Sequence, residues 1–253
     1  MRFASLGSGS EGNGLVVEVG DTRVLIDCGF RVRDTVARLA RLGIAPEAVS
    51  AILVTHEHAD HIGGVAAFAA RYRIPVWLTF GTLSMAGERF ERLDVRGFDS
   101  HDVFAVGMIE VRPFPVPHDA REPVQFVVGD GAKRLGILTD IGATTRYVEA
   151  SLSGCDALVV ECHHDLGMLE DGDYPWPLKQ RIASRLGHLH NEAAAALLAA
   201  LDTSRLTHIV AAHLSQQNNT PDKARAALSK ALNCAPDWIG IADQHDGFGW
   251  RAL

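Results

Sequence analysis

A short cluster of histidines sets the strongest limit on how this chain can fold: Thr55-His56-Glu57-His58-Ala59-Asp60-His61. It directly follows the apolar run Ala51–Val54, which reads as the body of a buried strand. Polar residues at the end of such a strand lie at the sheet edge, where ligand sites usually occur. In extended backbone, residues two apart share a face, so His56 and His58 can reach one ion. Burying these groups together without a cation is unfavourable, because polar groups lose their hydration.

The cluster continues into the next predicted helix. His61 starts that helix one turn from its partners, so Asp60 and His61 can face a second ion nearby. Gly63-Gly64 leaves room for a close backbone approach. Imidazoles with a carboxylate suit zinc, and manganese or iron accept the same donors. We therefore predict two divalent metal ions, with zinc as the best match.

Three more residues lie directly after predicted strands, where one sheet edge could gather them: His118, Asp140 and His213. Taken singly, each signal is weak. A histidine at a strand end is usually a hydrogen-bonded surface or core residue, and Asp140-Ile-Gly could be a plain turn. Their repeated placement is what makes them candidate metal ligands.

Composition limits the class of protein. Lys plus Arg is 24 and Asp plus Glu is 31, so the formal net charge is −7, which excludes a strongly basic nucleic-acid coat. A local basic patch or bound cations could still attract phosphate. No apolar run approaches the roughly 20 residues that span a bilayer, so no membrane partner is expected. The 4 cysteines are far apart, which suits free thiols in a reducing cytoplasm. No linker divides the chain, so we expect a single domain over residues 1–253.

Hydrophobic periodicity predicts strands that alternate with helices, which favours sheets covered by helices and leaves the topology open. The predicted strands are Leu15–Val19, Arg23–Asp27, Ala51–Thr55, Pro75–Thr79, Met108–Val116, Val124–Val128, Arg134–Thr139, Ala157–Glu161, His208–Ala212 and Trp238–Ala242. The predicted helices are Arg31–Leu42, Ile62–Arg71, Thr145–Leu152, Leu178–Leu186, Glu192–Leu201 and Pro221–Leu232.

Taken together, these motifs resemble the five-motif signature of the metallo-β-lactamase superfamily. The first of those motifs matches Asp27 in Val24-Leu-Ile-Asp-Cys-Gly29. The resemblance implies an α/β fold, a four-layer αββα sandwich with a dinuclear site at the sheet edge. It also implies which residues hold each ion: His56, His58 and His118 for one metal, Asp60, His61 and His213 for the other, Asp140 as a bridge, and Asp27 as a support.

A narrower resemblance is to the YycJ-like branch, which is associated with phosphodiester and exonuclease-type chemistry. It is carried by Ser5–Ser10, Val24–Gly29, His213-Leu-Ser215 and Asn218–Pro221, and Gly187-His188-Leu189 fits its pattern too. The resemblance implies supporting or substrate roles for Ser10, Asn13, Asn191 and Ser215. The chain departs from that pattern at Glu161-Cys-His-His-Asp165, where Glu-Ser-Asn-His-Asp is expected, and at His190, where serine is expected. These departures lie near the expected substrate cleft and bear on specificity.

The chemistry that follows is hydrolysis by a hydroxide that bridges two ions about 3.5–4 Å apart. Asp60 is expected to orient that hydroxide as well as to bind metal. A leaving alkoxide needs a proton, which His188 or His190 could supply, unless both only cap the helix that begins near Glu192. His164 is a further candidate at a strand end, with a surface loop as the plain alternative.

Three functions are compatible with the sequence, and the closing motifs, from His213 to Pro221, favour the first. The first is a dinuclear metal-dependent phosphodiesterase or exonuclease that acts on nucleic acid or another phosphodiester. The second is a hydrolase of small esters, thioesters or lactones with the same fold. The third is a non-catalytic nucleic-acid-binding or regulatory protein. The native metal, DNA against RNA, strand polarity and the oligomeric state, a dimer included, are left open.

Overall fold

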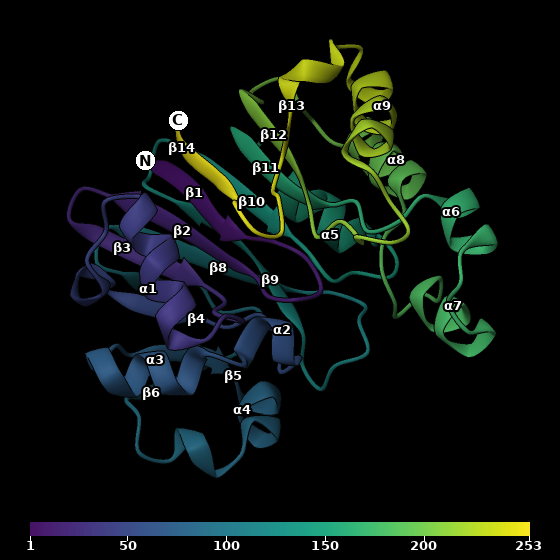
Figure 1. Cartoon of the computed structure of the whole chain (residues 1–253). Helices are drawn as coiled ribbons and strands as arrows, with labels where there is room; N and C mark the ends of the chain where they lie inside the picture. Colours follow the sequence, from purple (N-terminus) through teal and green to yellow (C-terminus); the bar gives the residue numbers. More distant parts are fainter.

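Two seven-stranded sheets pack face to face and carry helices on their outer sides (Figure 1). The computed structural model describes residues 1–253. The first sheet has the order β14-β1-β2-β3-β4-β5-β6 and the second β13-β12-β11-β10-β9-β8-β7. The strands are β1 (Arg2–Gly7), β2 (Gly14–Val19), β3 (Thr22–Ile26), β4 (Ala51–Leu53), β5 (Val76–Thr79), β6 (Val95–Phe98), β7 (Phe104–Val106), β8 (Ile109–Pro115), β9 (Val124–Gly129), β10 (Arg134–Leu138), β11 (Ala157–Glu161), β12 (His208–Ala212), β13 (Ile239–Ile241) and β14 (Phe248–Ala252).

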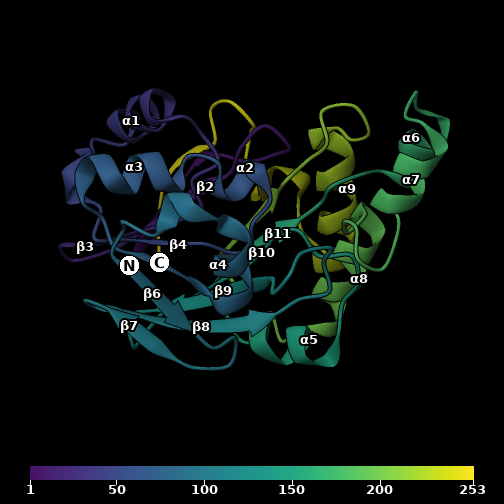
Figure 2. The same cartoon turned by 90° about the horizontal axis from the view of Figure 1, so that it is seen from below.

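The helices form the outer two layers, which confirms the predicted αββα sandwich (Figure 2). The first sheet is covered by α1 (Val32–Arg41), α2 (Ala59–Ile62), α3 (Val65–Tyr72) and α4 (Phe80–Ala86), and the second by α5 (Arg146–Leu152), α8 (Asn191–Ala200) and α9 (Pro221–Leu232). Two short helices, α6 (Leu166–Asp171) and α7 (Trp176–Ile182), lie beyond α8 and α9 at one end of the molecule (Figure 1). Single 3₁₀ turns occupy Pro46–Ala48, Glu88–Phe90 and Pro236–Trp238.

Three buried apolar clusters correspond to the three interfaces between the layers. The central one joins the two sheets and includes Phe3 and Val24 from the first sheet with Phe126 and Val159 from the second. The other two lie between each sheet and its helices. Strands buried on both faces explain the near-continuous apolar runs in the sequence, such as the fully buried β2 and β9.

Strand direction decides where the predicted ligands go. The strands β3 to β6 are parallel, and so are β10 to β13. The strand β8 runs in the same direction as β10, because both are antiparallel to β9. The carboxyl ends of these strands therefore open at one edge of each sheet, and every predicted metal ligand follows one of them.

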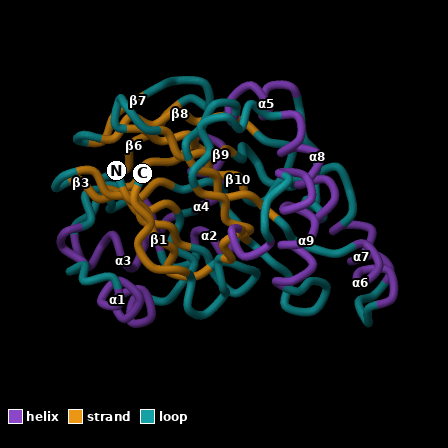
Figure 3. The backbone as a smooth tube through the Cα atoms, turned by 90° about the horizontal axis from the view of Figure 1, so that it is seen from above, coloured by secondary structure: helices purple, strands orange, loops and turns teal.

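Several elements differ from the sequence prediction. The strands β1, β6, β7 and β14 and the helices α4 and α6 were not predicted. The terminal strands β1 and β14 pair with each other, and the two chain ends lie side by side (Figure 3). A pairing between distant chain ends has no local signal. The predicted helix Leu178–Leu186 is shifted, because Pro175 and Pro177 favour an earlier start at α7. No helix has the length and apolar character to cross a bilayer.

A buried carboxylate lies at the amino ends of the parallel strands of the second sheet, at the edge opposite the candidate ligands. Asp156, before β11, is 2% exposed and accepts hydrogen bonds from Lys133 Nζ at 3.0 Å, the Arg134 N–H at 2.9 Å and Arg205 Nη2 at 3.1 Å. Burial raises the pKa of Asp156, but these donors lower it by a larger amount. The pKa of Asp156 therefore lies below its ordinary value. This carboxylate joins the start of β10 to the loops that hold Lys133 and Arg205, and it does not line the candidate site.

Replacing Asp156 by asparagine should lower the free energy of unfolding by about 1–3 kcal/mol at neutral pH, since charge-assisted hydrogen bonds are lost. A lowered carboxylate pKa stabilises the fold above its unfolded value of about 3.9, and the gain disappears as the pH falls through the folded pKa. The difference from the unmodified protein should therefore shrink in acid. Urea titrations between pH 3 and 7 measure it, with the exposed Asp171→Asn as control. A pH-independent difference would contradict the assignment.

Candidate metal centre and active site

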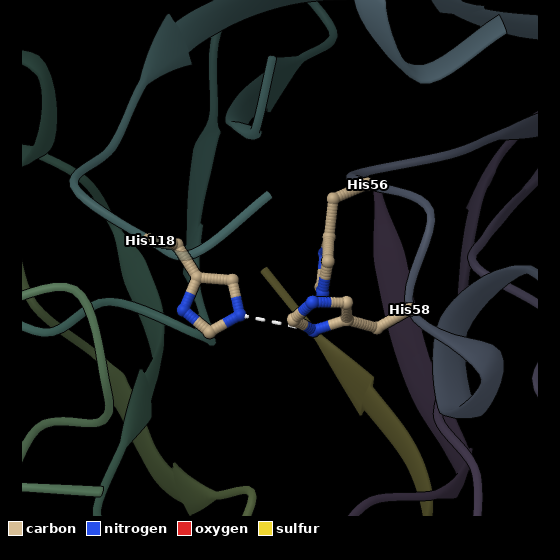
Figure 4. Close-up of side chains that lie close together, drawn as sticks. All are labelled: His56, His58 and His118. Atoms are coloured by element: carbon tan, nitrogen blue, oxygen red, sulfur yellow. Dashed lines mark hydrogen bonds between the residues drawn. The ribbon is translucent and has the colours of Figure 1, made fainter. Parts of the chain in front are cut away.

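Three imidazoles form the first donor set: His56 and His58 from the loop after β4, and His118 from the loop after β8 (Figure 4). Their ring centroids lie 4.6 to 4.9 Å apart, and one nitrogen of each ring lies within 4.8 Å of the others. His118 Nε2 and His58 Nδ1 are only 3.2 Å apart. The nitrogens converge on one point.

In two of these rings, the nitrogen that faces away from the other histidines makes a hydrogen bond, which shows that the nitrogen facing them carries a lone pair. His118 Nδ1 donates to the Gly187 carbonyl at 3.0 Å, and His58 Nε2 donates to the Asp119 carbonyl at 3.2 Å. A carbonyl only accepts, so the lone pairs of His118 Nε2 and His58 Nδ1 face inward. His56 Nδ1 lies 3.0 Å from Thr55 Oγ1, and its Nε2 is buried with no hydrogen-bond partner. This is the anchoring pattern of metal-binding histidines.

A second donor set lies beside the first and comprises Asp60, His61, Asp140 and His213, with ligand atoms within 4.8 Å of one another. His61 Nε2 lies 3.2 Å from Asp60 Oδ2 and 2.9 Å from Asp140 Oδ2. His213 Nε2 lies 3.4 Å from Asp60 Oδ2. Asp140 also comes within 3.8 Å of His118 Nε2, so its carboxylate stands between the two sets.

Carboxylates behind the second set anchor its imidazoles. His61 Nδ1 lies 2.8 Å from Asp27 Oδ2, and His213 Nδ1 lies 3.0 Å from Glu161 Oε1. Asp27 also accepts from the Thr55 N–H and hydroxyl, both at 2.8 Å. In both histidines Nδ1 is held by an oxygen acceptor, so Nε2 points toward Asp60.

At three of these residues, an unusual backbone conformation directs the chain toward the site. Asp27, Asp140 and His213 have φ values of 60°, 52° and 55°, in the left-handed region that non-glycine residues seldom occupy. Each follows a strand directly or within two residues, so the turn redirects the chain as it leaves the sheet. Such strain persists where surrounding structure holds it in place. Gly64 confirms the predicted close approach, since a Cβ there would overlap the Phe30 carbonyl oxygen.

Charge in the second set favours a cation. Burial lowers the pKa of His61, but the carboxylates of Asp140 and Asp60 raise it well above its ordinary value. Burial likewise opposes a proton on His213, yet the same two carboxylates and Glu161 raise its pKa to about 10. Asp140 shows the converse, because burial raises its pKa and the imidazoles lower it far more. A divalent cation balances the same carboxylates while leaving the imidazoles neutral, as ligands must be.

In the first set, burial and the neighbouring imidazoles outweigh the effect of the Asp140 carboxylate. Burial holds the pKa of His56 well below its ordinary value and lowers that of His118. Both rings are therefore neutral near pH 7, the state in which imidazole binds metal. The residues present thus fit divalent cations in both sets. Two buried atoms, one in each set, make no hydrogen bond: His56 Nε2 and Asp140 Oδ2. Asp140 Oδ2 lies 2.9 Å from His61 Nε2, but not in hydrogen-bond geometry.

A cavity of about 310 Å³ opens over these sets. Of the residues that the sequence analysis singled out, it is lined by Ser10, His58, Asp60, Asp140, Gly187, His188 and His213. His56 and His61 lie beneath it and are fully buried. Asn13, also buried, reaches the site from the side, where its Nδ2 lies 3.2 Å from Asp60 Oδ2.

His188 is the proton-donor candidate that the fold brings to the cavity. Its Nδ1 lies 2.9 Å from Glu161 Oε1, and its ring stacks on His163 with centroids 4.1 Å apart. Glu161 is fully buried, and its Oε2 accepts from the Ile141 and Leu189 N–H groups at 2.9 and 3.0 Å. Burial raises the pKa of Glu161, but His188 and His213 bring it below its ordinary value. One ionised carboxylate thus orients both histidines.

The other candidates lie outside the cavity lining. His190 is the N-cap of α8, where its Nδ1 accepts from the Ala193 N–H, which is the capping alternative raised for it from the sequence. His164 is buried with both ring nitrogens unpartnered, and burial lowers its pKa to about 4. Asn191 forms a reciprocal amide pair with Asn219 at 2.9 Å. Ser215 Oγ accepts from the Asn218 N–H within a turn. Roles for these residues in binding or proton transfer stay predictions.

Sequence reasoning gave no role to three residues that the fold places at the site: Asp119, Glu161 and Arg181. Glu161 ends β11, so the strand-end rule that selected Asp140 could have found it. Asp119, in the loop after β8, and Arg181, on α7, both line the cavity, and Arg181 Nε lies 2.7 Å from Asp119 Oδ2. No local sequence pattern signals such a pair.

Comparison with known proteins agrees with this geometry. Residues 22–209 match the model of the β-lactamase superfamily domain. The exodeoxyribonuclease YycJ of Bacillus anthracis is 37% identical over 250 residues, covering 97% of this chain and 95% of that protein. The chain belongs to the metallo-β-lactamase superfamily, in its YycJ-like branch.

Other members of the superfamily support the assignment. The exodeoxyribonuclease WalJ of Streptococcus pneumoniae serotype 2 is 32% identical, covering 95% of this chain and 91% of that protein. Among solved structures, Zn²⁺-bound PqqB from Methylobacterium extorquens superposes with a TM-score of 0.77 over both full chains at 17% identity, which shows the shared fold. As a metallo-β-lactamase-fold protein with these donor sets, the chain is a metal-dependent hydrolase that binds divalent metal.

Proposed function

We propose that this superfamily member is a metal-dependent exodeoxyribonuclease that shortens DNA strands from one end. The observation that carries the proposal is the meeting of two donor sets at Asp140, directly beside the His188–Glu161 pair. Relatives named exodeoxyribonucleases over nearly the whole chain support the same substrate class. The four free cysteines fit a reducing compartment, and we place the protein in the cytoplasm as part of this proposal.

The donor sets would hold two divalent ions, zinc by preference. His56, His58 and His118 would bind one, and Asp60, His61 and His213 the other, with Asp140 shared. Bound divalent cations lower the pKa of water and neutralise charge on a phosphate oxygen. The chain itself aims the imidazoles, through the Asp27, Glu161 and backbone-carbonyl anchors described above.

The leaving 3′- or 5′-oxygen of a cut strand needs a proton, and His188 is placed to supply it. Its side chain is 19% exposed and lines the cavity, while Glu161 holds Nδ1. With Nδ1 held, Nε2 is the nitrogen left to carry the transferred proton. A carboxylate behind a catalytic imidazole fixes its orientation and stabilises its protonated form.

The test is a comparison of substrates with zinc or manganese added. Single-stranded DNA labelled at either end should be shortened progressively from one end, and bis(p-nitrophenyl) phosphate should be hydrolysed more slowly. RNA of the same sequence decides the sugar preference. His118→Ala should remove activity, whereas His101→Ala, in an exposed loop, should not. Turnover of thioesters or lactones without any cleavage of phosphodiesters would overturn the proposal.

A further inference from the structure

We propose that Arg181 forms a phosphate subsite, which binds the phosphate next to the scissile one on the strand in the cavity. The inference deepens the proposed function and rests on it for the identity of the strand. Arg181 is on α7, in the helical segment that extends beyond α8 and α9 (Figures 1 and 2). Three α7 residues, Leu178, Arg181 and Ile182, line the same cavity as the donor sets.

The charges of the cavity wall single out this side chain. Twelve residues line the cavity, and Arg181 is the only lysine or arginine among them. Asp60, Asp119 and Asp140 line it too. Divalent ions at the donor sets would attract one phosphate, but the next phosphate of a strand carries its own charge and would meet carboxylates. With a chain net charge of −7, a cation at this wall is needed to hold that phosphate.

The guanidinium is already oriented for such a contact. Its Nε donates to Asp119 Oδ2 at 2.7 Å, while 62% of the Arg181 side chain is exposed. Because the guanidinium is a rigid plane with five N–H donors, anchoring Nε sets the direction of the other donors. Asp119 also lies 3.5 Å from His118 Nε2 and 3.7 Å from His58 Nε2, so the anchor ties Arg181 to the first donor set.

The rest of α7 adds positive charge without opposing it. Lys179 is the other basic residue of the helix, and Trp176–Ile182 contains no carboxylate. The acids of this segment, Glu170, Asp171 and Asp173, lie in α6 and the connecting loop. Lys179 Nζ donates to the Glu170 carbonyl at 2.6 Å and does not line the cavity, so Arg181 is the cation that α7 presents there.

The experiment measures binding of a fluorescent single-stranded DNA with phosphorothioate linkages to the zinc-loaded protein, by anisotropy at several salt concentrations. Arg181→Ala should weaken binding about 10- to 100-fold, the range of a charge-assisted hydrogen-bonded contact. The slope of log K against log salt should fall by about 0.7, as expected for one lost phosphate contact on a single strand. Arg181→Lys should recover part of the affinity, and Arg89→Ala, an exposed arginine of the 3₁₀ turn Glu88–Phe90, is the matched control.

Position is tested with strands that carry one neutral methylphosphonate at successive linkages from the end. At the linkage next to the scissile one, the losses of binding affinity caused by the methylphosphonate and by Arg181→Ala should not add, because both changes remove the same contact. In turnover, the variant should lose far more on the strand than on bis(p-nitrophenyl) phosphate. An unchanged salt slope with equal losses on both substrates would overturn the subsite and leave Arg181 as a latch for α7. Failure of the unmodified protein to cleave DNA would instead overturn the proposed function, while the salt slope still decides the subsite.

Discussion

Replacing Asp140 by asparagine is expected to lower kcat by about 10³-fold or more, since several kcal/mol of transition-state stabilisation depend on the metal ions. Asp140 is 2% exposed, and its carboxylate lies within 3.8 Å of histidines from both donor sets. Losing its charge should weaken the hold on both ions at once. Asparagine also tolerates the left-handed backbone at this position, so the turn should survive.

Elemental analysis after dialysis should find about two divalent ions per chain in the unmodified protein, as two-metal hydrolases hold, and markedly fewer in Asp140→Asn. Treatment with a strong chelator should reproduce the loss of activity in the unmodified protein, and added zinc or manganese should restore it. Asp94→Asn, at an exposed ion pair with Arg96, is the control for removing one negative charge. Full metal content together with full activity in Asp140→Asn would refute a shared ligand.

Replacing Glu161 by glutamine should lower kcat by about 10²- to 10⁴-fold, the range seen when the carboxylate behind a catalytic imidazole is lost. Glu161 is an acceptor on both sides, toward the Ile141 and Leu189 N–H groups and toward His188 and His213. A glutamine must turn its NH₂ group toward one of these pairs of donors. The buried mismatch should also lower the free energy of unfolding by about 1–3 kcal/mol.

The pH profile separates an orienting role from a structural one. If Glu161 orients His188, the variant should lose or shift the limb of the kcat profile that reports the proton donor. His188→Ala should flatten the same limb, and the two losses should not add. Glu110→Gln, at an exposed ion pair with Arg112, is the control. A variant that unfolds more easily but keeps its kcat and its pH profile would show that Glu161 only supports the fold.

Local sequence order was sufficient to predict metal chemistry, whereas the four-layer fold was predicted from the resemblance to a known family. A histidine spacing of two after a buried strand indicates metal chemistry wherever the strand lies. The same strand-end position then selected His118, Asp140 and His213, and the structure brings all of them within reach of the cluster at His56–His61. The metallo-β-lactamase resemblance turned this set into a predicted four-layer architecture, which the two sheets and their helices confirm.

The partners of each ligand were decided only by tertiary structure. Which ring nitrogen faces inward depends on Gly187, Asp119, Asp27 and Glu161, which are brought to their histidines from as far as 69 residues away. Preferring His188 to His190 and His164 as the proton-donor candidate also needed the fold, because only His188 lines the cavity. Local sequence encodes backbone direction and side-chain chemistry over a few residues, whereas a hydrogen bond such as Arg181–Asp119 exists only after the layers have packed.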